Sequence, residues 1–139
     1  MALIPEIDRE ATIKKTKNFF KKVWPRIVLQ SGLTAMSLRS PEITDMPTSA
    51  PTGNANEKLM VRMLERQDDV KNVIRCINSL EAKKKEIMRA SYIDNIPNWK
   101  IAQQLGYSEP RYYQLKNEAL VDFADASSVY GFKLLIEKS

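Results

Sequence analysis

The chain has 139 residues, of which 43% are hydrophobic and 28% charged, so it can bury the core of one ordinary domain and is not globally disordered. It contains no histidine and one cysteine, Cys76, which excludes Ser-His-Asp and Cys-His catalysis, an internal disulfide and a Cys-x-x-Cys metal site. The formal net charge of +5 suits a polyanionic partner. We therefore expect a non-enzymatic protein without a metal or another cofactor, in which Cys76 is a buried, inert thiol.

The first predicted element is a basic amphipathic helix over about residues 7–29, within an N-terminal segment of residues 1–30. Apolar residues recur there near helical spacing, and Pro25 predicts a kink or break near Trp24. Seven bases against three acids give this segment a charge of +4, most of the total for the chain. Its lysines form a predicted auxiliary basic surface: Lys14, Lys15, Lys17, Lys21 and Lys22.

The same segment has acids and lysines where a signal peptide has its apolar run. No stretch of the sequence approaches the ~18–20 apolar residues that cross a bilayer. We expect an intracellular protein with no membrane partner.

Residues 31–56 predict a linker, because "SPEITDMPTSAPTGNAN" has three prolines, one glycine and little to bury. A second helix is predicted over about residues 57–79, with an apolar stripe that includes Met63, Val70 and Ile77. Its heptad-like spacing lasts barely three repeats. Packing against the C-terminal helices of the same chain is therefore favoured over a dimer seam.

A third helix is predicted over about residues 81–93. The stretch "DNIPN" ends it, because Asp94 and Asn95 are turn formers and Ile96 precedes a proline. The helix adds three lysines to the auxiliary basic surface, although such a cluster is also usual on a solvated helix face: Lys83, Lys84 and Lys85.

The stretch "WKIAQQLGYSEPRYYQLKNEAL", residues 99–120, predicts two helices around a tight turn. Asn98 is a suitable N-cap for the first helix, Gly106 suits a left-handed residue at its end, and Ser108 is a suitable cap for the second. Helices joined by so few residues cross steeply, and Ala102 supplies a small residue at the contact. We predict a helix-turn-helix over residues 98–123 of an all-α domain, residues 57–126, with a helical hairpin of no nucleic-acid role as the alternative.

If the second of these helices enters the major groove of double-stranded DNA, its outward N-terminal residues meet the base edges. Glutamine and asparagine can pair with adenine, glutamate can accept from cytosine, and tyrosine or proline can contact a thymine methyl group. The predicted base contacts are Glu109, Pro110, Tyr113, Gln114 and Asn117. The predicted phosphate contacts are Lys100, Ser108, Arg111 and Lys116.

The net charge of the predicted helix-turn-helix region is unfavourable for DNA binding. Residues 97–126 contain three bases and four acids, and such a site is a poor source of affinity for DNA. Either the N-terminal helix and Lys83–Lys85 supply the positive field, or two copies bind together. Both alternatives predict that the isolated C-terminal part binds weakly.

Residues 127–139, "SSVYGFKLLIEKS", form an apolar C-terminal extension. It either folds onto its own domain or exchanges with a second copy to make a homodimer. The sequence leaves both open.

A family resemblance covers residues 80–120, which are similar to region 4 of sigma-70-type initiation factors. The helix-turn-helix there has the form I-A-x-x-L-G-x-S, and the residues that match are Ile101, Ala102, Leu105, Gly106, Ser108, Arg111, Gln114, Ala119 and Leu120. The positions that read bases in that family fall on Glu109, Pro110, Tyr113 and Gln114. Only Gln114 keeps the residue type of the family, which implies that a different promoter element is read.

The whole chain more closely resembles the ArpU-like, or autolysin-regulatory, proteins of phages and prophages. Their layout is a basic helix, a linker, a middle helix, then "LGYS", a "YYxLKxEAL" helix and a terminal "FA". Here the last pieces read "LGYSEPRYYQLKNEAL" and "FA" at residues 123–124. The resemblance implies a transcriptional regulator of phage late genes that binds DNA in the cytoplasm of a bacterial host.

The leading hypothesis is therefore a sequence-specific DNA-binding regulator, with activation favoured over repression and RNA polymerase left open as a second partner. One alternative is a small terminase subunit, which would form a ring and mark phage DNA for packaging. The other is a helical adaptor that binds RNA polymerase without touching DNA.

Overall fold

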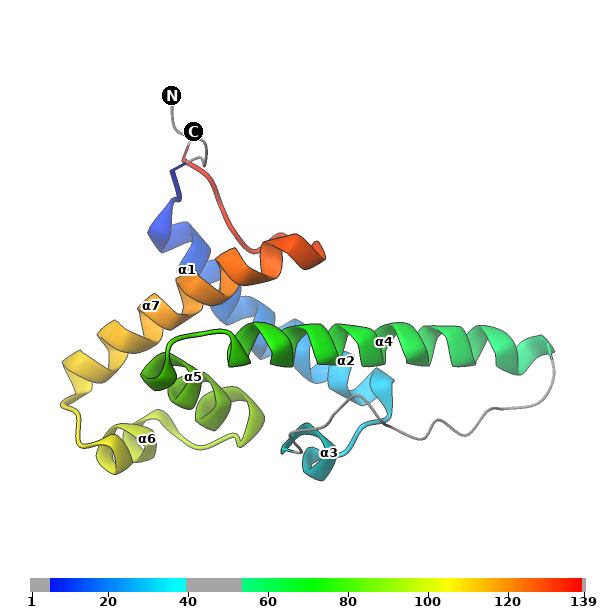
Figure 1. The fold of residues 1–139 in the computed structure, drawn as a ribbon, viewed down its shortest axis with the longest axis horizontal. Helices are drawn as coiled ribbons and strands as arrows, with labels where there is room; N and C mark the ends of the chain where they lie inside the picture. Colours follow the sequence, from blue (N-terminus) through cyan, green and yellow to red (C-terminus); the bar gives the residue numbers. More distant parts are fainter. Residues whose placement is uncertain (1–5, 40–53, 139) are drawn as a thin grey trace.

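The computed structural model describes residues 6–39 and 54–138, and within them the fold is all-α with no strand, as predicted (Figure 1). The helices are α1 (Arg9–Asn18), η1 (Phe19–Val23), α2 (Trp24–Ser31), α3 (Ala35–Arg39), α4 (Asn54–Asn78), α5 (Ala82–Met88), η2 (Arg89–Ile93), α6 (Asn98–Leu105), α7 (Glu109–Ser127) and η3 (Ser128–Tyr130). None of these helices combines the length and the apolarity needed to span a membrane.

The predicted interruption of the first helix takes the form of a π-helical turn, η1, rather than a kink at Trp24. Pro25 has no N–H to donate to Lys21, four residues earlier, and its ring crowds that carbonyl group. The backbone N–H of Trp24 donates instead to the carbonyl of Phe19, five residues back. The helix therefore continues through Pro25 as α2, which ends at Gly32 in the left-handed conformation with a φ of 73°.

An aromatic cluster joins the N-terminal helices to the C-terminal half of the fold. The Phe20 ring stacks on Tyr92 of η2 with centroids 4.1 Å apart and lies 4.8 Å from Phe123 of α7. The indole N–H of Trp24 donates to the backbone carbonyl of Tyr92 at 3.2 Å. The N-terminal helices are thus built into the same core as α4 and α7, and α1 packs along α7.

Helix α4 has two different halves. Its C-terminal half buries Val70, Val73 and Ile77 against α2 and α7. Its N-terminal half extends away from the body of the molecule, with Leu59 and Val61 exposed (Figure 1). The structure therefore supports the predicted packing within the chain for the C-terminal half of α4.

The predicted linker contains a short helix at its start. In α3, Leu38 is buried in the main core, and the Arg39 guanidinium donates from Nε to Asp94 Oδ1 at 3.1 Å. The proline-rich remainder, residues 40–53, lies outside the described residues.

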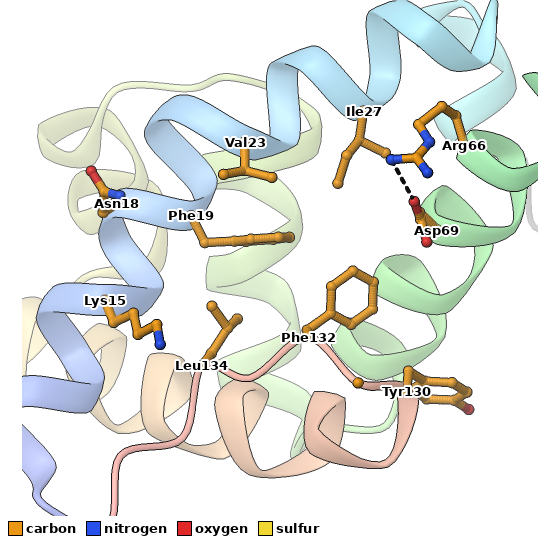
Figure 2. A pocket seen from close by; sticks show the side chains of 11 residues that line it. Lys15, Asn18, Phe19, Val23, Ile27, Arg66, Asp69, Tyr130, Phe132 and Leu134 are labelled. Carbon is orange, nitrogen blue, oxygen red and sulfur yellow. Dashed lines mark ion pairs between the residues drawn. The ribbon is translucent and has the colours of Figure 1, made fainter. Parts of the chain in front are cut away.

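The C-terminal extension folds back onto the N-terminal helices of the same chain. Leu134 is buried, the Phe132 ring packs edge-on to Phe19 with centroids 5.6 Å apart, and the Asp8 N–H donates to the carbonyl of Ile136 at 2.8 Å. A hollow of about 440 Å³ lies between this extension, the N-terminal helices and α4. Figure 2 shows the side chains that line it, among which Arg66 and Asp69 form an ion pair. Its other lining is mainly apolar: Phe19, Val23, Ile27, Tyr130, Phe132 and Leu134.

Candidate nucleic-acid interface

Helices α6 and α7 are joined by a three-residue turn. Gly106 ends α6 in the left-handed conformation, with φ 75° and ψ 24°, and the Tyr107 N–H donates to the Ala102 carbonyl at 3.0 Å. Ser108 begins α7, because its Oγ accepts a hydrogen bond from the Arg111 N–H at 3.3 Å. The two helices diverge from this turn rather than lying along one another (Figure 1).

A small apolar cluster holds the two helices together. Ile101 and Ala102 of α6 contact Tyr112 and Leu115 of α7, and Ile87 of α5 closes the cluster. Ala102 was predicted at this contact, and all five residues are buried. The N-terminal half of α7 therefore has a fixed support on one side, which leaves its other side for solvent.

Asn98 has a different role from the predicted cap. It is the first residue of α6, and its side chain forms no capping hydrogen bond. Its Oδ1 instead accepts from the Tyr112 hydroxyl at 2.7 Å and from the Lys116 ammonium at 2.8 Å. Burial raises the pKa of Tyr112 above its ordinary range, so this hydroxyl stays a donor. A polar contact thus ties the start of α6 to α7.

The predicted base-reading residues form one exposed face, with one exception. Glu109, Pro110, Tyr113 and Gln114 are exposed, and 42% of Tyr113 is accessible to solvent. Arg111 holds Gln114, because its Nη1 donates to Gln114 Oε1 at 3.0 Å. These side chains lie on the first two turns of α7, the part of a recognition helix that meets base edges in a major groove.

Asn117 is the exception among the predicted base contacts. It is half-buried, and its Oδ1 is shielded from solvent with no hydrogen-bond partner among the described residues. We therefore leave Asn117 out of the exposed face of α7.

Among the predicted phosphate contacts, Lys100, Ser108 and Arg111 are exposed, whereas Lys116 is not. Only 6% of Lys116 is accessible, and its ammonium donates to Ser91 Oγ at 3.0 Å in addition to Asn98. Burial, and secondarily the charge of Lys17, lower the pKa of Lys116 to about 8. It lies beneath the exposed face rather than on it.

The two parts of the predicted basic surface differ in their charge partners. In α5, the Lys84 ammonium lies 2.8 Å from the Asp122 carboxylate, and the Lys83 ammonium lies 4.0 Å from the Glu86 carboxylate. The hydrogen bond that the Lys84 ammonium donates to Asp122 raises the pKa of Lys84. The N-terminal lysines are exposed and form no ion pair with another described residue: Lys14, Lys15, Lys17, Lys21 and Lys22. Within the predicted basic surface, the unneutralised positive charge therefore lies on α1 and η1 and at Lys85 of α5, which also forms no ion pair with another described residue.

The sequence reasoning missed Trp99. It lies on the first turn of α6 beside Lys100, and 62% of its surface is exposed. The polar Gln103, four residues beyond Trp99 on the same face of the helix, was the available signal.

The described residues offer little for a metal or for thiol chemistry. No three His, Cys, Asp or Glu side chains within residues 6–39 and 54–138 come together as metal ligands. Cys76 is buried as predicted, and desolvation raises the pKa of its thiol to about 11.

Comparisons with known proteins give one family model and two relatives that share a name. A family model described as "Protein of unknown function (DUF1492)" matches residues 51–124. A protein of Enterococcus hirae, named "Putative autolysin regulatory protein ArpU", is 28% identical over 128 residues, which cover 91% of this chain and 93% of the relative. A protein of Streptococcus phage O1205 with the same name is 28% identical over 127 residues, or 88% of this chain and 91% of the relative. No solved structure gives a significant match.

Proposed function

The chain belongs to the DUF1492 family, and we propose that it is a sequence-specific DNA-binding regulator of transcription that reads a major groove with the N-terminal half of α7. The single observation that carries the proposal is the exposed face that follows the Gly106 turn. Its four side chains project from a helix whose opposite side is fixed in the fold: Glu109, Pro110, Tyr113 and Gln114.

These side chains carry chemistry that discriminates base pairs. The Gln114 amide can pair with adenine at two atoms, and the Glu109 carboxylate can accept from the cytosine amino group. The Tyr113 ring and Pro110 provide apolar contact for a thymine methyl group. The exposed Lys100, Arg111 and the cap at Ser108 lie on both sides of the turn, where they can meet phosphates and fix the register.

The unpaired lysines of α1 and η1 supply the charge that α6 and α7 lack. Because α1 packs on α7, Lys17 and Lys21 line the same hollow as Tyr113. This arrangement supports the first of the two sequence-based alternatives for the source of positive field. It makes a single copy sufficient for a basic interface, and it makes the N-terminal helices part of the DNA-binding unit.

The regulatory part of the proposal rests on the relatives. Both are named as autolysin regulatory proteins, and one of them belongs to a phage. Together with the resemblance to sigma region 4, these names support a regulator of phage late genes that acts on promoters in the bacterial cytoplasm. Activation, with RNA polymerase as a second partner, is the mode we propose.

The test is binding to DNA fragments from the genome that encodes the chain, measured as a function of salt. Wild-type protein should protect a discrete site, and Gln114→Ala should reduce discrimination at one base position by about 1–3 kcal/mol. Val129→Ala, which changes an exposed apolar residue on η3, is the matched control and should leave the footprint unchanged. Unchanged affinity and site preference in both Gln114→Ala and Tyr113→Ala would overturn the groove assignment.

A second candidate, a helical adaptor that binds a protein and not DNA, is favoured by one observation. The projecting half of α4 exposes three apolar side chains: Leu59, Val61 and Leu64. Such a surface suits a protein partner. Failure to bind duplex DNA at low salt, with retained binding to RNA polymerase, would favour this adaptor over the regulator.

A further inference from the structure

A second hollow, of about 440 Å³, lies where the N-terminal helices meet the junction of α6 and α7. Lys17 and Lys21 line it from α1 and η1, Asn98 from α6, and Tyr113 and Lys116 from α7. Three lysines from two distant parts of the sequence thus face one space. No aspartate or glutamate of the described residues lines it.

Lys116 is the deepest of these cations, and its partners are neutral. Its ammonium donates to Ser91 Oγ and to Asn98 Oδ1, and it lies 4.9 Å from the centre of the Tyr92 ring. These contacts orient the ammonium without cancelling its charge. The positive charge of Lys17 repels this ammonium.

This arrangement is unfavourable for stability alone. A buried cation without a counter-ion costs free energy, and an apolar side chain of the same length would pack as well. An anion in the hollow would lower this cost, because the lysines that line it would attract the anion. The hollow is therefore positively charged, and no acidic side chain among its described lining residues neutralises that charge.

We propose that this hollow binds a phosphate group, and that its occupant is a backbone phosphate of duplex DNA held beside the exposed face of α7. The proposal rests on the proposed function, since Tyr113 borders both the hollow and that face. A phosphate held here fixes the distance between the DNA backbone and Gln114. The N-terminal helix is then one wall of a specific site as well as a source of general positive charge.

The experiment compares wild type with Lys116→Met and Lys17→Met in two assays. Lys116→Met removes the buried charge and keeps an unbranched side chain that is one atom shorter, and Lys17→Met provides an exposed position where folding is not at risk. Lys58→Met is the matched control, because Lys58 is exposed on the projecting half of α4, with no ion pair to another described residue. The first assay measures the rise in melting temperature on adding inorganic phosphate, against chloride at equal ionic strength.

The second assay measures the affinity of the same proteins for a random-sequence duplex over a range of salt. We expect phosphate to stabilise the wild type and the control but neither pocket variant. We expect duplex affinity to fall roughly tenfold in Lys116→Met and Lys17→Met, with the salt slope reduced by about one, against about twofold in Lys58→Met.

The outcomes separate the two proposals. Equal duplex affinity in Lys116→Met and Lys58→Met, with the wild type still binding DNA, overturns the phosphate site and leaves the proposed function standing. Phosphate stabilisation that the pocket variants lose, in a wild-type protein that binds no duplex, establishes an anion site and overturns DNA as its occupant. Equal stabilisation by phosphate in all four proteins also counts against the site.

Discussion

The two halves of α7 are buried against different partners and therefore have different roles. From Ala119 onward the helix lies in the aromatic core, where Leu120 and Phe123 are fully buried. Before that point it rests on the small cluster of α6 and α5 and presents a polar face to solvent. The part of α7 that stabilises the core and the part that we propose reads DNA are thus separated along one helix. Substitutions should divide accordingly into those that unfold the protein and those that change binding alone.

The largest effect is expected in the C-terminal half of α7. Phe123→Ala removes a ring that lies 4.8 Å from Phe20 and 6.2 Å from Phe19, and leaves a cavity at the centre of the aromatic cluster. The free energy of unfolding should fall by about 3–5 kcal/mol in denaturant titrations. Val129→Ala, at an exposed position beyond α7, should change it by less than about 0.5 kcal/mol. A fall of less than about 1 kcal/mol in the free energy of unfolding of Phe123→Ala would show that Phe123 is not part of the main core.

A smaller, pH-dependent effect on stability is expected from Lys116 beneath the exposed face of α7. Its pKa is lowered to about 8, so between that pH and the ordinary lysine value near 10.5 the unfolded chain binds more protons than the folded one. This contribution makes stability rise with pH. The free energy of unfolding of Lys116→Met, relative to that of the wild type, should fall by on the order of 2 kcal/mol between pH 7 and pH 10.

Comparing the two proteins at each pH cancels the other groups that titrate in this range. Cys76 in the main core is one such group, whereas Tyr92 of η2 stays protonated throughout this range, since burial raises its pKa to about 12. A difference that stays constant with pH would mean that Lys116 is not desolvated.

The turn between the two helices should show an intermediate effect. Gly106 has a φ of 75°, and a Cβ placed there meets no atom within 4 Å, so Gly106→Ala suffers backbone strain without a clash. We expect a loss of about 1 kcal/mol in the free energy of unfolding. Stability equal to that of the wild type would show that the turn tolerates another conformation.

The smallest effect on stability is expected at the cap of α7. Ser108→Ala removes the acceptor for the Arg111 N–H and should cost about 0.5–1 kcal/mol. Ser108→Asp should keep the stability of the wild type, since aspartate caps as well as serine. It should nevertheless weaken duplex binding, because a carboxylate there repels phosphate. Equal duplex affinity in both variants would remove Ser108 from the interface.

Sequence patterns sufficed for the parts of the fold that local chemistry determines. The helices around Gly106, the cap at Ser108 and the buried Cys76 follow from backbone preference and apolar spacing. The π-helical turn η1 could not be predicted from the sequence. A proline predicts that a helix is interrupted, but it does not predict whether the preceding turn kinks, breaks or becomes π-helical.

The candidate site was less predictable, because its polarity depends on contacts between distant segments. Helical spacing placed Lys116 near the exposed face, whereas Ser91 and Asn98 hold it underneath. The sequence predicted both Lys83 and Lys17 as members of the basic surface, yet of the two only Lys83 has a carboxylate of a described residue within 4.0 Å of its ammonium. Tertiary pairing decides which charges remain for a partner, and a single sequence does not contain that information.

The central claim is that DNA meets the N-terminal half of α7 together with α1. The most direct measurement is the change in backbone amide NMR signals as duplex DNA is added to the full chain at low salt. The account predicts changes concentrated at residues 108–116 and 14–22, with little change along the projecting half of α4. Unchanged signals at saturating DNA, or changes confined to α4, would contradict it.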